Sequence, residues 1–131
     1  MTTPQSRHDQ VLYRHPLIDQ LFWVDPGLDH GILDRLNRLP GVTVWSVCAG
    51  HAEEKHNQSA VALEIPDGPR GVEALRRFGT LGRRCALWHL IVGYVPESQV
   101  WWLRLEFPWS GEPAPPEWWS ELAATCEGIL S

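Results

Sequence analysis

The sequence has very little lysine and no long apolar run. Lys55 is the only lysine among 131 residues, the other basic residues are scattered arginines, and the formal net charge is −5 with a pI near 5.6. An extended basic surface for a nucleic acid is therefore not expected. No apolar run approaches the roughly 18 residues that a membrane-spanning helix needs, so a membrane span is not expected either.

Cysteine is also sparse. Cys48, Cys85 and Cys126 are odd in number and far apart, which does not suggest a disulfide framework. Residues 1–10 are polar, lack the apolar core of a signal peptide and are expected to form a flexible segment. These features favour a cytoplasmic protein in which residues 11–131 form a single domain.

Apolar and aromatic residues are plentiful. The chain is 44% hydrophobic and holds eight tryptophans, which is sufficient for one buried core. Strand-like composition occurs at 20–24, 42–48, 59–65, 84–95 and 99–107, and helical spacing at 26–39, 69–82 and 116–130. The apolar stretch 17–24 would also suit one or two helical turns that start at Pro16, but a strand over 20–24 is favoured. This order predicts one α+β (or α/β) domain, with about three helices packed on a mixed sheet of about five strands.

Several element ends carry recognisable signals. Asp25 is a good N-cap for the first helix, with Pro26 at its first position. Gly82 is a plausible glycine at the end of the second helix. The stretch 84–95 is apolar on both faces, which is typical of a central strand, and it is expected to form a hairpin with 99–107.

The most chemically rich stretch is CAGH, residues 48–51, at the end of the strand 42–48. Cys48 can serve as a nucleophile, a metal ligand or a small buried residue. Gly50 suits a tight turn or the close approach of a ligand to the backbone. His51 can act as a general acid or base, or as a ligand anchor.

The topology gives a reason for a site at this point. If strands 20–24 and 42–48 are parallel neighbours, the helix between them makes a right-handed crossover. Asp25 would then share a sheet edge with the CAGH turn, and ligands of open α/β sheets bind at the carboxyl ends of strands. The sequence therefore places Asp25, Cys48 and His51 together as candidate catalytic residues.

The segment LNRLPGVTVWSVCAGH resembles small bacterial proteins of unassigned function that carry a pattern like PGV-T-x-x-SC-x-GH. More distantly, it is similar to the tRNA wybutosine-synthesis methyltransferase family, which has an SSCSGR turn, uses S-adenosylmethionine and acts on a modified guanosine. The matching positions are Asn37, Thr43, Ser46, Cys48 and Gly50. His51 stands where that family has arginine, and Ala49 and Val47 stand where it has serines. The resemblance implies a functional turn at 46–51 and a nucleotide or S-adenosylmethionine-like ligand.

Three functions remain open. The first is a small enzyme or ligand-binding domain, in which Ser46 and Gly50 contact a small-molecule ligand and Trp102 stacks on it. The second is a non-enzymatic interaction module, with homodimer formation as one possibility. Its surface would use the tryptophans of the C-terminal third, which are Trp101, Trp102, Trp109, Trp118 and Trp119.

The third function is metal binding. Cys48 and His51 have a C-x2-H spacing, and His56 or His89 would supply a further ligand. A second short pair of ligands is missing from the sequence, so a metal is not the favoured interpretation. No cofactor is identified by the residues themselves.

Overall fold

The computed structural model describes residues 10–50, 59–85, 88–108 and 112–131. Almost all of the segment predicted to be flexible, residues 1–10, lies outside these ranges. His51, His56 and Trp109 lie outside them as well.

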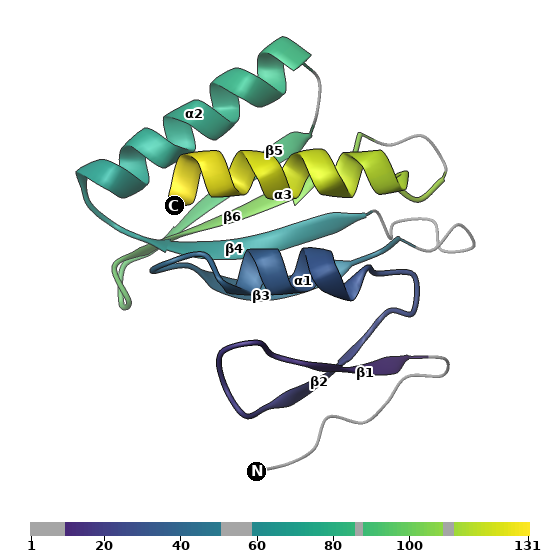
Figure 1. Cartoon of the computed structure of the whole chain (residues 1–131). Helices are drawn as coiled ribbons and strands as arrows, with labels where there is room; N and C mark the ends of the chain where they lie inside the picture. The colour runs from purple at the N-terminus through teal and green to yellow at the C-terminus, as the bar shows by residue number, and fades with distance from the viewer. Residues whose placement is uncertain (1–9, 51–58, 86–87, 109–111) are drawn as a thin grey trace.

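The described ranges form six strands and three helices in two antiparallel sheets (Figure 1). In order they are β1 (Val11–Arg14), β2 (Leu21–Val24), α1 (His30–Asn37), β3 (Thr43–Cys48), β4 (Ala60–Pro66), α2 (Pro69–Cys85), β5 (His89–Val95), β6 (Val100–Glu106) and α3 (Pro116–Leu130). The strand order of the larger sheet is β3-β4-β6-β5, and β1 and β2 pair by themselves. The predicted α+β single-domain class is confirmed.

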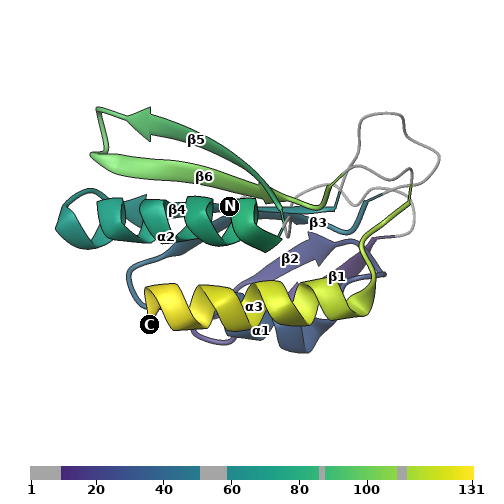
Figure 2. The ribbon, with the colours of Figure 1, turned by 90° about the horizontal axis from the view of Figure 1, so that it is seen from above.

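The core lies between the larger sheet and the helices. β4 and β6 are its central strands, and their alternate residues Val61, Leu63, Leu103 and Leu105 are fully buried. α3 contacts both α1 and α2, and Figure 2 shows α3 beside α1 with α2 next to the sheet. Within the described part of the chain, none of the helices has the length and apolar character needed to cross a bilayer.

The β2 and β3 strands occur where the sequence predicts them, but they are not parallel neighbours. β2 pairs antiparallel with β1, whereas β3 pairs antiparallel with β4 in the other sheet. β1 has only four residues and was not predicted. It gives β2 a nearby hairpin partner, and closing that short loop costs less chain entropy than a crossover of the longer segment to β3. The predicted crossover is therefore wrong.

The first two helices differ from the predicted ones at their ends. α1 begins at His30, and its N-cap is Asp29, whose Oδ1 accepts from the Gly31 amide at 2.7 Å. Asp25 is therefore not the cap. α2 runs past Gly82 to Cys85, and a Cβ on Gly82 would lie 2.5 Å from Trp88 Nε1. Gly82 makes room for a buried indole and does not end the helix.

The strand predicted as central is an edge strand. β5 pairs only with β6, and its outer edge has no partner strand in the described sheet. Its apolar side chains are therefore partly exposed, with Ile91, Val92 and Tyr94 each 40–45% accessible. An apolar stretch alone does not distinguish a central strand from an uncovered edge.

Candidate functional site

Asp25 lies beside the turn that follows β3. Its Oδ2 accepts a hydrogen bond from the Ala49 amide at 3.0 Å, and the residue is only 9% exposed. The predicted proximity of Asp25 to this turn is present, although the crossover that suggested it is absent. The link is instead a direct bond between the end of the β1–β2 hairpin and the end of β3.

Ser59 joins the same turn to the segment before α3. Its Oγ donates to the Ala49 carbonyl at 2.6 Å and accepts from the Ala114 amide at 2.8 Å, and the residue is almost fully buried. Ser59 was not among the residues predicted for the site. A polar residue directly before the apolar strand β4 was the available signal, but only the fold places it against Ala49 and Ala114.

Cys48 is a half-buried thiol. Burial is the main cause that raises its pKa, and the charge and hydrogen bond of Asp25 raise it further, while the Gly50 backbone and Arg104 lower it. A thiol with a raised pKa forms little nucleophilic thiolate at neutral pH. This arrangement does not favour Cys48 as a nucleophile, and Cys48 is not among the described residues that line the adjacent pocket.

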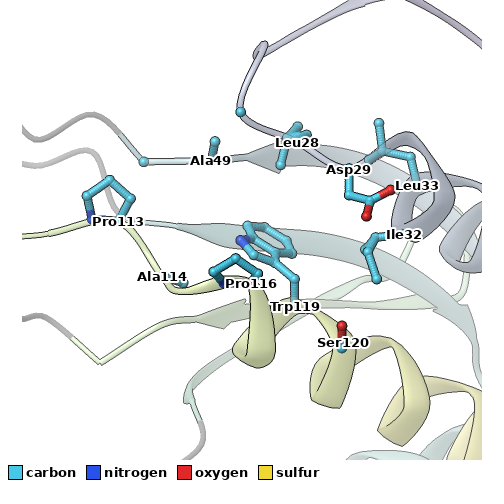
Figure 3. A pocket seen from close by; sticks show the side chains of 12 residues that line it. Leu28, Asp29, Ile32, Leu33, Ala49, Pro113, Ala114, Pro116, Trp119 and Ser120 are labelled. Atoms are coloured by element: carbon cyan, nitrogen blue, oxygen red, sulfur yellow. The ribbon is translucent and has the colours of Figure 1, made fainter.

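A pocket of about 520 Å³ opens between this turn and the first turns of α1 and α3 (Figure 3). Ala49 and Gly50 form one side, and Gly50 has a φ of 87°. Trp119 from α3 and Leu28 and Ile32 from the α1 side supply apolar walls. The volume is within the range of small-molecule sites.

Two polar side chains line this pocket. They are Asp29, at the start of α1, and Ser120, on the exposed side of α3. One Asp29 oxygen caps α1, and within the described part of the chain the other accepts no hydrogen bond. The described lining holds no lysine, arginine or histidine, so Asp29 is its only charged side chain.

Two of the predicted ligand contacts lie elsewhere. Ser46 is exposed on β3 and lines a separate groove between β2 and β3. Cys48 of β3 pairs with Ala60 of β4, and Ala60 pairs with Glu106 of β6. Trp102 lies four positions before Glu106 on β6 and pairs with Glu64. Trp102 is therefore about 13 Å along the strand from the row of residues that contains Cys48. Of the predicted site residues, the structure brings together Asp25, Cys48 and Gly50.

Of the residues in the metal hypothesis, the structure describes Cys48 and His89, whereas His51 and His56 lie outside the described ranges. His89 is exposed on the edge strand β5. Among the described residues, no three histidine, cysteine or acidic side chains lie close enough to hold a metal ion.

The tryptophans of the C-terminal third are mostly not at the surface. Trp118 and Trp119 are 5% and 8% exposed and contact each other edge to face, and Trp101 and Trp102 are half-buried. Among the described residues, the largest exposed aromatic side chain is Trp45 on β3, which is 62% accessible. Trp45 lies where the register between β3 and β4 shifts, between Val44 and Ser46. A run of β-forming residues in the sequence does not reveal such a shift.

Comparison of the chain with protein-family models, with curated proteins and with solved structures finds no match.

Proposed function

We propose that this protein binds a small nucleoside-containing molecule of neutral or positive charge in the pocket beside the Ala49–Gly50 turn, with S-adenosylmethionine as the first candidate. The observation that carries the proposal is the composition of the pocket. It combines a flat aromatic wall, an exposed backbone turn and a carboxylate, without any basic side chain in its described lining.

The charge of the pocket favours cationic ligands over phosphorylated ones. A phosphorylated nucleotide would bring several negative charges next to Asp29, with no lysine or arginine in the described lining to compensate. S-adenosylmethionine carries a sulfonium cation, which is attracted both by the Asp29 carboxylate and by the face of an indole such as Trp119. Amino groups of the ligand would find an acceptor in the second Asp29 oxygen.

The backbone supports the same proposal. A glycine at φ 87° leaves no side chain between a ligand and the chain at Gly50. Ser59 and Asp25 hold the preceding residue, Ala49, from both sides, so the turn is fixed before a ligand arrives. The resemblance of the 46–51 turn to an S-adenosylmethionine-dependent family selects this ligand among nucleosides. Binding is proposed, and no reaction is assigned to Cys48 or Asp25.

Isothermal titration calorimetry of the full chain with S-adenosylmethionine, S-adenosylhomocysteine and ATP tests this function. We expect binding in the order S-adenosylmethionine, then S-adenosylhomocysteine, with ATP weakest. Asp29→Asn should weaken the binding of S-adenosylmethionine about tenfold, since it removes the charge but retains an N-cap side chain. Ser120→Leu should abolish binding by filling the pocket from an exposed helix position.

Glu97→Gln provides the matched control, because it removes one exposed carboxylate at the β5–β6 turn, away from the pocket. It should leave the affinity unchanged. If ATP binds more tightly than S-adenosylmethionine, or if Asp29→Asn and Glu97→Gln have equal effects, the proposal is wrong.

A second candidate function is self-association through the last hairpin. β5 is an unpartnered edge of seven residues without a charged side chain, and its apolar residues Ile91, Val92 and Tyr94 are exposed. Natural edge strands usually carry charges or prolines that prevent pairing with another chain. An uncharged edge also avoids repulsion when the same surface meets itself across a two-fold axis.

Sedimentation velocity over a range of concentrations tests this second candidate. Wild type should form a dimer, and Val92→Lys should shift it to monomer. Val72→Lys is the matched control, because Val72 is equally exposed but lies on α2. A wild-type chain that remains monomeric at all concentrations would rule out the self-association.

A further inference from the structure

A second, larger cavity lies along the free edge of β3. This groove has a volume of about 790 Å³ and is bounded by β2 on one side and by the chain from Pro40 to Val47 on the other. Within the described part of the chain, β2 pairs only with β1 and β3 only with β4, so each has one edge without a partner strand. The groove is distinct from the pocket beside Gly50, and the two share only Leu33.

The walls of the groove are apolar. Phe22, Val24 and Val44 are partly buried against the core, while Leu17, Ile18 and Trp45 are at least half exposed at its rim. Exposed apolar side chains of this size, gathered around one cavity, are typical of a binding surface. A cavity of this volume can accommodate a small ligand with a long apolar portion.

The charge of the groove is opposite to that of the whole chain. The protein has a formal net charge of −5, but the described lining of the groove holds Arg38 and His15 and no aspartate or glutamate. Within the described part of the chain, the Arg38 guanidinium makes neither a hydrogen bond nor an ion pair. A cation at the edge of an apolar groove is complementary to an anionic head group.

We propose that the groove between β2 and β3 binds an amphipathic carboxylate, a long-chain carboxylic acid whose hydrocarbon chain lies along the apolar walls. Its carboxylate pairs with Arg38 at the end of α1. The ligand class follows from three features together: the apolar walls, the unpaired guanidinium and the absence of acidic residues from the described lining.

Titration of the full chain with dodecanoate, kept below its micelle concentration and followed by calorimetry, tests the proposal. We expect saturable binding of one molecule per chain. Dodecyltrimethylammonium has the same chain with a cationic head, and it should bind at least tenfold more weakly. Arg38→Gln should reduce the affinity for dodecanoate about five- to tenfold. Leu17→Glu should reduce it as well, because it places a carboxylate at the exposed rim.

Two controls separate this site from general charge effects and from the other pocket. Arg77→Gln removes an exposed arginine of α2 outside the groove and should leave dodecanoate binding unchanged. Ser120→Leu, which fills the pocket beside Gly50, should leave it unchanged too. The proposal is overturned if dodecanoate shows no saturable binding, if the cationic analogue binds equally well, or if Arg38→Gln and Arg77→Gln behave alike.

Discussion

The Asp25 carboxylate accepts a hydrogen bond from the Ala49 amide at 3.0 Å, which joins the end of β2 to the end of β3 although the two strands belong to different sheets. Ser59 holds the carbonyl of the same residue, Ala49. The candidate pocket therefore rests on a turn that is fixed at both its amide and its carbonyl.

Replacing Asp25 tests this link. Asp25→Ala leaves the Ala49 amide without its acceptor, and we expect the free energy of unfolding to fall by about 1–3 kcal/mol. Asp25→Asn retains a side-chain oxygen and should cost less. Urea denaturation measures both, and a stability of Asp25→Ala equal to that of wild type would show that the bond contributes nothing.

The reactivity of Cys48 tests its electrostatic surroundings. Burial and Asp25 raise the pKa of this thiol, so iodoacetamide should alkylate it slowly at neutral pH, with a rate that still rises above pH 8.5. A Cys85→Ser variant simplifies the readout, because the pKa of the buried Cys126 thiol is raised to about 12. Asp25→Asn should move the pH profile downward. Fast alkylation of Cys48 at pH 7 would contradict the assignment.

Tyr13 makes stability depend on alkaline pH. Burial and its hydrogen bond to Asp34 raise the pKa of this phenol to about 12, above the unfolded value near 10. The folded chain therefore binds more protons between these values, so the contribution of Tyr13 is complete below pH 10 and is lost as the pH rises through 12.

Tyr13→Phe should cost about 1 kcal/mol at neutral pH, and the difference from wild type should shrink between pH 10 and pH 12. Guanidinium denaturation at several pH values measures this difference. Tyr94→Phe is the comparison: the hydrogen bond to Asp67 also raises the pKa of Tyr94, but this residue lies at the surface, so its pH-dependent difference should be smaller. A difference that is independent of pH for Tyr13→Phe would disprove the linkage.

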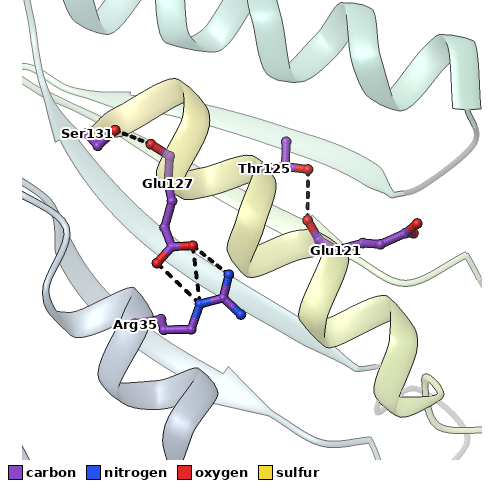
Figure 4. A network of polar contacts seen from close by, with 5 residues as sticks. All are labelled: Arg35, Glu121, Thr125, Glu127 and Ser131. Atoms are coloured by element: carbon purple, nitrogen blue, oxygen red, sulfur yellow. Dashed lines mark hydrogen bonds and ion pairs between the residues drawn. The ribbon is translucent and has the colours of Figure 1, made fainter.

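The ion pair between Arg35 and Glu127 connects α1 to α3 (Figure 4). Arg35 Nη2 lies 2.5 Å from Glu127 Oε1, and its Nε donates to both carboxylate oxygens. Since both side chains are about 40% exposed, we expect a coupling of only about 0.5–1 kcal/mol in a double-mutant cycle with Arg35→Gln and Glu127→Gln.

Arg35 lowers the pKa of Glu127, so this coupling should be present at neutral pH and disappear as the pH falls through that lowered value. The more exposed pair of Arg14 and Asp19 is the comparison and should show a smaller coupling. A coupling that persists at pH 2 would contradict an electrostatic origin.

Two glycines of α2 should respond to alanine in opposite directions. Gly82→Ala would place a Cβ 2.5 Å from Trp88 Nε1, in a buried contact, and should cost about 1–3 kcal/mol. Gly79→Ala meets only Leu90 at 3.8 Å and should gain up to about 1 kcal/mol from helix propensity. Thermal unfolding measures both. A lower melting temperature for Gly79→Ala than for Gly82→Ala would refute this packing.

Much of the local structure followed from the sequence. Strands 42–48, 59–65 and 99–107 and the helix 116–130 occur within a residue or two of their predicted bounds, because β-branched runs, alternation and helical spacing are local signals. β1 was missed, because Tyr13 is the only buried residue of its four, which leaves no alternating pattern in the sequence. Gly82 was misassigned, because its reason is the Trp88 indole and not its own backbone.

For the candidate site, the sequence by itself determined which residues follow β3 and that Gly50 permits a backbone turn there. Only the tertiary structure decided what meets that turn. Asp25 reaches it from a different sheet, Ser59 from the start of β4 and Trp119 from α3, while Ser46 and Trp102 lie away from it. These outcomes depend on which strand edges pair and which helix faces pack, and such choices rest on contacts between residues far apart in the chain, which local patterns do not encode.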